Sequence, residues 1–366
     1  MRILVLLIDA FGGHGGIALY NRDLLTALCA HPDCAEVVAI PRLMPNRSEP
    51  QPAKLTYVTN GLKSKISYLK AVQQTVKKNP RFDLIVCAHI NLIPVAFMLR
   101  LKLKAPIVLV IYGIDAWQPT KSLLVNKLVN KIDSFISISN VTRQRFLTWS
   151  NLPAEKGFLL PNAIHLEEYG PGPKNAELLK RYGLEGKTVL MTLGRLVSQE
   201  RYKGFDELME VLPELAKEIP NIAYLIVGKG SDQYRLEKKA RALGIAGRVV
   251  FTGFIPETEK ADHFRLADAY VMPSSGEGFG FVFLEAMACG VPVVASKVDG
   301  SREAVRDGEL GLLVDPTDRE ELLAAIRMAL GGERGKVPEG LDYFSFGRFT
   351  EHLHGIIGLI VGGSAI

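Results

Sequence analysis

The sequence predicts an α/β protein with two Rossmann-like domains, each built on a parallel β-sheet that helices cover on both faces. Short apolar runs rich in β-branched residues alternate with stretches of helical periodicity, which is the pattern of parallel sheets. The length of 366 residues is enough for two domains of roughly 150 residues each. A segment rich in Pro, Gly and charge, 171–186, separates a first series of elements from a second. We therefore place the first domain at residues 1–170.

The first domain begins with an apolar run at residues 3–8, which predicts a buried strand. A glycine-rich loop, 12–16, follows it. Residues 17–29 then have helical spacing, with Leu24, Leu25 and Leu28 on one face. Further short apolar runs predict strands at 37–40, 84–87, 107–111 and 135–138.

The second domain is expected over residues 171–345. Its apolar runs predict strands at 189–193, 223–227, 249–251, 269–272 and 293–295, with helical stretches between them. A last helix is expected at 346–360, beyond the second sheet, and residues 361–366 are expected to fray.

The composition excludes a disordered or fibrous chain, because 48% of the residues are hydrophobic and 23% are charged. The net charge of +5 is unevenly spread. Residues 1–165 hold 20 Lys or Arg against 9 Asp or Glu, a balance of +11, and the remaining residues hold 24 against 30, a balance of −6. This asymmetry suggests an anionic partner for the first half: a membrane surface, a phosphorylated ligand or a nucleic acid.

The four cysteines, Cys29, Cys34, Cys87 and Cys289, form no CxxC pair and have no His cluster beside them. Buried free thiols in a reducing cytosol are the expected state. The first apolar run is too short for a signal peptide, and no stretch reaches the roughly 18 apolar residues that span a bilayer. We therefore expect a cytoplasmic protein, either soluble or peripheral on the inner face of the plasma membrane.

A candidate anion site lies at the start of the second domain. Gly194 and Arg195 end a predicted strand, and Lys203 and Gly204 precede a predicted helix. Ligands of open α/β sheets bind beyond the carboxyl ends of the strands, where two cations beside a helix N-terminus suit a diphosphate. The alternative is a pair of solvated surface cations, and the two interpretations stay open at this point.

Two glutamates, Glu277 and Glu285, are separated by seven residues in a glycine-rich loop and the helix that it opens. The free backbone N–H groups of such a loop can bind a phosphate or a sugar hydroxyl. Glu285 has mostly apolar neighbours in its helix, so we expect it to have a defined polar partner rather than to be an ordinary exposed residue. A second glycine turn, 227–230, could bring backbone close to a nucleotide or could be a plain tight turn.

At these residues the chain resembles a known family. The segment GEGFGFVFLEAMACGVPVVAS resembles the E-x7-E signature of the family 4 retaining glycosyltransferases of the GT-B fold. Four more blocks are similar to those of the family in the usual order, so the resemblance covers nearly the whole chain: LLPNAIH, MTLGRLVSQERYKGFDEL, IAYLIVGKGSDQYRLE and VVFTGFIPETE. The resemblance implies two Rossmann-like domains that face an interdomain cleft, and a helix at 346–366 that crosses back to the N-terminal domain.

The resemblance also implies a function. The expected activity moves a hexose, with retention, from a nucleotide diphosphate sugar to a glycan or lipid-linked acceptor in cell-surface polysaccharide, lipopolysaccharide or glycolipid synthesis. No cofactor or metal is expected, because the sequence has no DxD-type metal motif. The alternatives are a GT-B nucleotide-sugar epimerase or hydrolase, and a non-catalytic nucleotide-sugar binding protein.

The family's roles carry over to matching positions. Arg195 and Lys203 would bind the donor diphosphate and stabilise the leaving group; Lys203 matches better than Arg201 because it precedes the glycine that opens the helix. Glu277 would contact the donor sugar and Glu285 the ribose. The expected donor contacts are Gly16, Arg195, Lys203, Gly228, Ile255, Glu277, Phe279, Gly280, Phe281, Val282 and Glu285, and the candidate catalytic residues are Glu277, Arg195, Lys203 and Asp115.

The glycine loop of the first domain also matches a dinucleotide fingerprint, GxGxxA, at residues 13–18. An NAD-binding domain would need an acidic residue at the end of the second strand, but that strand ends in Pro41 and Arg42, and Glu36 precedes it. The dehydrogenase interpretation is therefore disfavoured. In the glycosyltransferase interpretation, Gly16 offers the backbone contact to the donor.

Three residues of the first domain are acceptor-side candidates: His14, Tyr112 and Asp115. Many relatives have a His at the position of Tyr112, and a phenol is a poor base at neutral pH, so Asp115 is the better candidate to orient the acceptor hydroxyl. Asp115 could instead be the N-cap of the next helix, and His14 an ordinary surface residue. His89, at the end of another strand, is expected to be structural.

Cations cluster on the first domain. A helix is expected over 61–78, with Leu62, Ile66, Leu69 and Val72 along one side. The three cationic clusters are Lys63, Lys65, Lys70, Lys77 and Lys78; Arg100, Lys102 and Lys104; and Lys121, Lys127 and Lys131. They are either solvated helix faces or a site for anionic lipid head groups, as in relatives that build lipid-linked glycans. Nucleic acid is not expected, because no basic segment is interleaved with aromatic residues.

Overall fold

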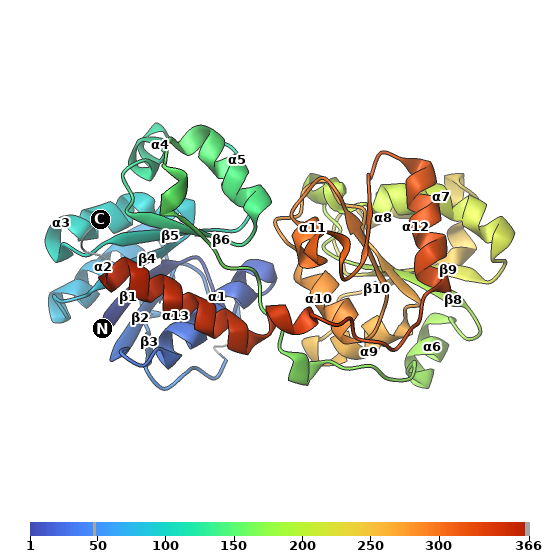
Figure 1. Cartoon of the computed structure of the whole chain (residues 1–366), viewed down its shortest axis with the longest axis horizontal. Coiled ribbons are helices and arrows are strands. Elements are labelled where there is room, and N and C mark those ends of the chain that lie inside the picture. The colour runs from blue at the N-terminus through green and yellow to red at the C-terminus, as the bar shows by residue number, and fades with distance from the viewer. Residues whose placement is uncertain (47–48, 363–366) are drawn as a thin grey trace. The chain divides into compact units, whose positions relative to one another are not determined.

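The computed structural model describes residues 1–46 and 49–362. The chain folds into two compact units: in Figure 1 the first is coloured from blue to green and also includes the red helix near the C-terminus, and the second is coloured from green to orange. Unit 1 consists of Met1–Ala163 together with the segment from Phe346 onward, and unit 2 of Ile164–Ser345. Each unit contains one β-sheet with helices packed against it, as the alternating sequence pattern predicts.

The sheet of unit 1 has seven strands in the order β3-β2-β1-β4-β5-β6-β7, and all neighbours are parallel. The strands are β1 (Arg2–Leu7), β2 (Glu36–Pro41), β3 (Leu55–Tyr57), β4 (Leu84–Ala88), β5 (Ile107–Ile111), β6 (Ser134–Ser137) and β7 (Gly157–Leu159). The helices are α1 (Gly16–Ala30), α2 (Lys65–Lys78), α3 (Ile93–Leu103), α4 (Leu123–Val129), α5 (Asn140–Ser150) and α13 (Phe346–Gly362). The order of the strands along the sheet reverses between β1 and β4.

The sheet of unit 2 has six parallel strands in the order β10-β9-β8-β11-β12-β13. They are β8 (Thr188–Leu193), β9 (Ile222–Val227), β10 (Val249–Gly253), β11 (Ala269–Val271), β12 (Val293–Ser296) and β13 (Leu312–Val314). The helices are α6 (Ala176–Tyr182), α7 (Phe205–Glu218), α8 (Gln233–Ala242), α9 (Lys260–Leu266), α10 (Phe281–Ala288), α11 (Ser301–Ala304) and α12 (Arg319–Gly331). The strand order reverses between β8 and β11, and such a switch point is where open α/β sheets bind ligands.

The central strands of both sheets are buried on both faces. Every residue of β4, β5 and β9 is buried, which explains why their sequences are continuous apolar runs without alternation. The core of each unit is formed by these strands and the apolar faces of the covering helices. All four cysteines are free and buried, as predicted.

The boundary between the units lies between residues 163 and 164, so the predicted boundary at 170 falls inside unit 2. The backbone N–H of Ile164 donates to Phe344 O at 2.8 Å, and Arg265 Nε donates to Gly170 O at 2.9 Å. Residues 164 and 170 are thus hydrogen-bonded to unit 2, although the sequence predicts that segment 164–170 belongs to the first domain.

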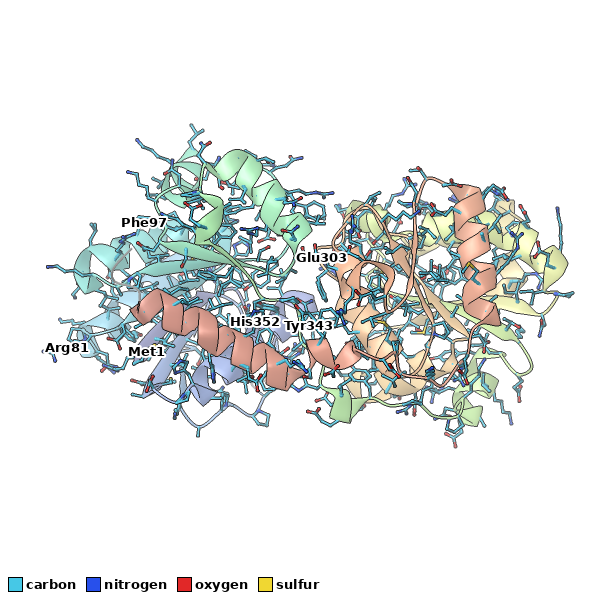
Figure 2. All side chains as sticks on the ribbon, in the orientation of Figure 1. Met1, Arg81, Phe97, Glu303, Tyr343 and His352 are labelled. Atoms are coloured by element: carbon cyan, nitrogen blue, oxygen red, sulfur yellow. The ribbon has the colours of Figure 1, made fainter. Side chains whose placement is uncertain are left out.

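The last helix, α13, belongs to unit 1, where it runs alongside α1 (Figure 1). The ring of Phe349 packs edge-to-face on Tyr20 at 5.6 Å, and His354 Nε2 lies 2.8 Å from Ala27 O. His352 of α13 is exposed, and Tyr343 lies in the segment just before the helix (Figure 2). Residues 361 and 362 are helical where fraying is predicted, and 363–366 lie outside the described residues.

Helix α2 differs from its prediction in two ways. It begins at Lys65 rather than at residue 61, because the side chains of Ser64 and Ser67 bond to each other's backbone N–H in a capping box. Its buried side is formed by Tyr68, Ala71, Val72, Thr75 and Val76, whereas Ile66 is 68% exposed. Of the predicted apolar side, Val72 is buried, but Ile66 and Leu69 are exposed, so the prediction is wrong for these two. In the described part of the chain, no helix is long and apolar enough to cross a membrane.

Candidate functional site

Beside the switch point of unit 2, two turns pack together at the carboxyl ends of the neighbouring strands β8 and β9. Gly194 N donates to Val227 O at 2.9 Å, and Leu196 N donates to Lys229 O at 3.1 Å, so the turns after β8 and β9 pack backbone to backbone. A Cβ at Gly228 would overlap Gly194 O, and one at Gly230 would overlap Leu196 O. Close packing of two backbones thus accounts for Gly228 without a ligand, in agreement with the tight-turn interpretation.

Lys203 is the central cation of this edge. Its Nζ donates to Glu277 Oε1 and lies 3.9 Å from Glu200 Oε2, and its side chain is only 14% exposed. Burial lowers the pKa of Lys203, but the Glu277 carboxylate outweighs burial and holds that pKa above the usual value. The next residue, Gly204, has φ 82° and begins α7; a Cβ there would lie 2.6 Å from Pro273 O.

Arg195 is placed differently. Its side chain is 78% exposed, and its guanidinium donates to Glu200 Oε1. Glu200 therefore lies between the two predicted cations and accepts from one of them. Arg201 pairs with Asp206 instead, with Nε 3.4 Å from Oδ2. The position that reaches the Glu277 loop is thus Lys203, as the glycine after it indicates, and not Arg201.

The loop that carries Glu277 is held by the loop after β12. Asp299 Oδ2 accepts from the backbone N–H of Glu277 at 2.7 Å and from Ser274 Oγ at 2.7 Å. The backbone N–H of Gly300 donates to Glu277 O at 2.9 Å. Gly280, with φ 94°, then starts α10. Sequence reasoning missed Asp299 because it belongs to none of the motifs that led to the other site residues.

Glu285 is buried in α10, with 1% of its surface exposed. Its Oε1 accepts from Lys260 Nζ at 2.6 Å and from Tyr169 Oη at 3.0 Å, while Oε2 is buried without a hydrogen-bond partner in the described residues. The expected polar partner therefore exists, but sequence reasoning identified neither Lys260 nor Tyr169. Burial lowers the pKa of Lys260, and the carboxylates of Glu285 and Glu257 outweigh it and raise that pKa.

The other predicted donor contacts of unit 2 lie around this edge with different exposures. Phe279 is 1% exposed and packs edge-to-face on Phe344 at 5.5 Å, and its backbone contact with a donor stays a prediction. Phe281 and Val282 form the first turn of α10, and Val282 is half-buried. Ile255 is half-buried just beyond β10, and its place near the base stays a prediction.

Tyr112 is turned into the core of unit 1. Its hydroxyl donates to Asn21 Oδ1 at 2.6 Å and lies 3.2 Å from Ala88 O, and its ring packs edge-to-face on Tyr20 at 5.5 Å. Burial raises the pKa of Tyr112 well above its usual value. The hydroxyl of Tyr112 is thus already bonded inside the unit, and a role of this residue on the acceptor side stays a prediction.

Asp115 lies in the turn after β5. Its Oδ1 accepts from the backbone N–H of Tyr112 at 3.3 Å, and its Oδ2 is buried without a partner among the described residues. Burial raises the pKa of Asp115 to about 7, although backbone hydrogen bonds oppose this shift. The helix N-cap interpretation is wrong, because the next helix, α4, is capped by Ser122.

The glycine loop of unit 1 leads from β1 to α1. Gly13 packs tightly, since a Cβ would lie 2.7 Å from Asp9 Oδ2, whereas His14 and Gly16 are exposed. Glu36 lies at the amino end of β2 and bonds to Arg2 and Thr56, away from this loop, as the argument against NAD requires. His89 Nδ1 accepts from Asn91 N at 3.1 Å, which is the expected structural role.

In residues 1–46 and 49–362, no group of three or more His, Cys, Asp or Glu side chains is placed to hold a metal ion.

Two parallel-sheet units with polar residues at their switch points define a GT-B protein. Among solved structures, sucrose-phosphate synthase from Thermosynechococcus elongatus has a TM-score of 0.78 at 22% identity and covers 100% of both chains. HepE of Anabaena with UDP has a TM-score of 0.75 at 21% identity and covers 98% of this chain and 99% of its own.

The chain belongs to the family 4 glycosyltransferases. Residues 14–168 match the family model "Glycosyltransferase Family 4", and residues 175–340 match "Glycosyl transferases group 1". A phosphatidyl-myo-inositol mannosyltransferase of Mycolicibacterium smegmatis is 31% identical over 73% of this chain and 68% of its own length. A GDP-mannose-dependent alpha-(1-6)-phosphatidylinositol monomannoside mannosyltransferase of the same organism is 36% identical over 61% of this chain, which spans 59% of that relative.

Proposed function

We propose that the protein is a retaining glycosyltransferase that moves a hexose from a nucleotide diphosphate sugar to a glycan or lipid-linked acceptor, without a metal ion. The observation that carries this proposal is the buried ion pair between Lys203 and Glu277 at the switch point of unit 2. The two side chains of this ion pair are only 14% and 15% exposed, and removing their charges from water costs free energy. A contribution to stability alone would therefore not explain the pair.

The proposed chemistry follows from charge. Departure of a nucleoside diphosphate places negative charge on the leaving phosphate and positive charge on the anomeric carbon. Lys203 is buried against Glu277, and Arg195 is exposed and paired with Glu200, so we propose that the two cations meet one diphosphate together. Cations placed in advance where negative charge develops lower the barrier. Glu277 then lies next to the sugar that leaves the diphosphate.

Glu285 fits a ribose in this scheme. Lys260 and Tyr169 occupy Oε1, and this leaves the buried Oε2 to accept hydrogen bonds from a ribose diol. A buried carboxylate oxygen without a partner is unfavourable in the free protein, and a ligand hydroxyl would remove that penalty. In this scheme Glu285 recognises the ribose, and it therefore selects for a ribonucleotide rather than for one nucleobase.

We further propose mannose as the hexose, GDP as the nucleotide and a phosphatidylinositol-based glycolipid as the acceptor. Support comes from the names of the two mycobacterial relatives, which include mannosyltransferase and phosphatidylinositol or phosphatidyl-myo-inositol. The solved neighbour with UDP has a lower identity and supports the fold only.

A donor panel tests the proposal. Thermal unfolding is measured with GDP, UDP, GDP-mannose and UDP-glucose, because a ligand that binds only the folded state raises its stability by about 2.7 kcal/mol at a hundred times its Kd. Turnover is then measured with and without mannosylated glycolipid acceptors. Acceptor-dependent sugar transfer supports the proposal. Release of free sugar or an epimer without acceptor would identify a hydrolase or epimerase, and binding without any product would identify a binding protein.

We also propose that unit 1 docks on an anionic membrane surface, on the inner face of the plasma membrane. Helices α3 and α4 contact each other and expose apolar residues beside cations: Leu101 is 85% exposed, Leu123 86% and Leu124 57%. Lys102, Lys104 and Lys121 are exposed on the same two segments. Apolar side chains within a cationic surround are typical of segments that bind anionic lipids.

A further inference from the structure

We propose that Asp299 and Gly300 form a backbone clamp that positions Glu277 for transfer, with Asp299 as a positioning residue that does not itself touch the substrate. This inference rests on the proposed function, because it concerns the loop whose glutamate lies next to the donor sugar. Neither residue belongs to the motifs that define the family resemblance.

The clamp holds Glu277 at both of its backbone polar groups. Asp299 Oδ2 accepts from the N–H of Glu277 at 2.7 Å, and the N–H of Gly300 donates to the carbonyl oxygen of Glu277 at 2.9 Å. The two contacts come from neighbouring residues of one loop. Together they fix both the position and the rotation of the Glu277 peptide units.

Gly300 is the steric half of the clamp. Its φ of −67° and ψ of −13° suit any residue, so backbone freedom is not the reason for a glycine here. Instead, a Cβ would overlap Gly278 O and lie 3.0 Å from Glu277 O. The absence of a side chain lets the two loops approach closely enough to make the hydrogen bond.

Holding Glu277 through the carboxylate of Asp299 costs folding free energy. Its side chain is fully buried and accepts four hydrogen bonds, from Ser274 Oγ, Glu277 N, Ser301 N and Ser301 Oγ, at 2.6 to 3.0 Å. No ion pair in the described residues includes Asp299, so only neutral donors stabilise it. Burial raises its pKa, and these hydrogen bonds oppose the shift. A buried unpaired carboxylate costs stability, which points to a role in placement.

The placement extends to the cation. The clamp sets the backbone of Glu277, and the side chain of Glu277 in turn accepts from Lys203 Nζ. The backbone of the loop is also tied to the segment before Lys203, because Ser275 N donates to Tyr202 O at 2.8 Å. A shift of the Glu277 peptide would therefore displace the carboxylate proposed to lie beside the donor sugar, while Lys203 also stays close to Glu200.

Three variants of the full chain test the clamp. Asp299→Asn leaves one of the backbone N–H donors without an acceptor, whereas Gly300→Ala forces the loops apart at a φ that alanine tolerates. Ser301→Ala is the matched control: it removes a buried hydroxyl bond to the same carboxylate, but on Oδ1, and so leaves the Oδ2 bond to Glu277 in place. Steady-state kinetics give kcat and KM, and calorimetry with the nucleoside diphosphate alone gives its Kd.

We expect Asp299→Asn and Gly300→Ala to lower kcat at least tenfold while the nucleoside diphosphate Kd stays within threefold of the wild type. Ser301→Ala should keep kcat within threefold. The clamp is overturned if both variants keep kcat within threefold, if Ser301→Ala loses as much kcat as Asp299→Asn, or if Kd weakens in parallel with kcat. Should Asp299→Asn not fold, Gly300→Ala decides alone.

Hydrogen exchange separates a failure of the clamp from a failure of the proposed function. If the wild type transfers no sugar, the proposed function fails, and the clamp is then judged by exchange at the backbone N–H of Glu277. Faster exchange there in Asp299→Asn but not in Ser301→Ala supports the clamp. Equal exchange in both variants refutes it.

Discussion

Lys203 and Arg195 carry the same charge but have opposite surroundings. Lys203 is buried against two carboxylates, whereas Arg195 extends into solvent with one. The buried position gives a fixed charge, and the exposed one gives a charge that can move toward a ligand.

Replacing either cation should therefore have the same effect on catalysis but different effects on stability. Lys203→Ala and Arg195→Ala should each lower kcat/KM on the order of a hundredfold, by about 3 kcal/mol of transition-state stabilisation. Lys203→Ala should also lower the free energy of unfolding, because it leaves the buried carboxylate of Glu277 without its cation, while Arg195→Ala should change it by less than about 0.5 kcal/mol. Kinetics and urea unfolding measure both effects, with the exposed Lys217→Ala as the control. Near-normal turnover of Lys203→Ala would remove it from the site.

Asp115 should link activity to pH. Since burial raises its pKa to about 7, the rate of transfer should rise with pH through that value if the ionised carboxylate orients the acceptor hydroxyl. Asp115→Asn should abolish this rise and lower kcat while donor binding is kept. A normal rate in this variant would exclude Asp115 from the site.

The same shift has an opposite consequence for stability. The native pKa of Asp115 lies above its unfolded value of about 3.9, so its stabilising contribution is complete below that unfolded value and is lost as the pH rises through about 7. Asp115→Asn should therefore raise the free energy of unfolding at pH 8 relative to the wild type, measured by urea unfolding. A lower stability at pH 8 would contradict the buried, unpartnered Oδ2.

The residues that sequence reasoning missed share a property: their roles depend on partners far away in the chain. Lys260 and Tyr169 reach Glu285 from 25 and 116 residues away, and neither lies in a motif. Asp299 did carry a usable signal. It follows β12, the parallel neighbour of β11, so the rule that placed Arg195 at a strand's carboxyl end applies to it as well.

At the scale of elements, the central strands were predictable, but of the four edge strands in the described sheets only β10 was predicted. Strands β3, β7 and β13 were missed; each has three residues and forms an edge of its sheet. An edge strand has one neighbour and is only partly buried, so its sequence need not be a continuous apolar run. The predicted strand at 107–111 matches β5. All residues of this strand are buried, so its sequence is a continuous apolar run that is easy to recognise.

The pairing of α1 with α13 should weaken in acid. His31, which follows the last residue of α1, packs its ring at a tilt of 59° against that of His354 of α13, with centroids 4.7 Å apart. Burial lowers the pKa of His31, and His354, the N-terminus and Lys54 lower it further, while Asp33 opposes them. Because the native pKa lies below the unfolded value of about 6.5, the stability is complete above that value and is lost as the pH falls through the native pKa.

One variant of the contact and one control variant on the exposed side of α13 test this pH dependence. His31→Gln should flatten the loss of unfolding free energy between about pH 7.5 and about pH 5, as measured by urea unfolding. His352→Gln, on the exposed side of α13, is the control and should keep the wild-type slope (Figure 2). Equal slopes for His31→Gln and the wild type would refute a role for the histidine contact.

At the scale of the whole molecule, the charge asymmetry of the sequence follows the two units. The balance of +11 belongs to unit 1, since α13 adds one Arg and one Glu, and the −6 belongs to unit 2. Unit 2 holds the proposed donor groups with a few placed cations. The excess positive charge of unit 1 is spread over the surfaces of its helices. Such a wide distribution favours an extended anionic surface as the partner over a small ligand.

Membrane binding should therefore depend on salt and on the exposed leucines of α4. The protein should bind vesicles that contain phosphatidylglycerol at low salt and leave them as salt rises, because each cation contributes about 1 kcal/mol near an anionic surface. The double substitution Leu123→Ser and Leu124→Ser should weaken this binding, measured by flotation. Met328→Ser, which removes a 64% exposed side chain of unit 2, is the control. If the wild type does not bind these vesicles at low salt, the proposal of membrane docking is refuted.

The return of the chain to unit 1 at α13 has a consequence for biosynthesis. Ribosomes deliver residues 164–345 before they deliver α13, so unit 2 can complete its fold while unit 1 still lacks a helix. Until then, the surface beside α1 that receives Phe349, Leu353, Ile356 and Ile357 is open to water. The usual order, in which the first domain matures first on the ribosome, is thereby reversed, and a nascent chain released before α13 would present that apolar surface to chaperones.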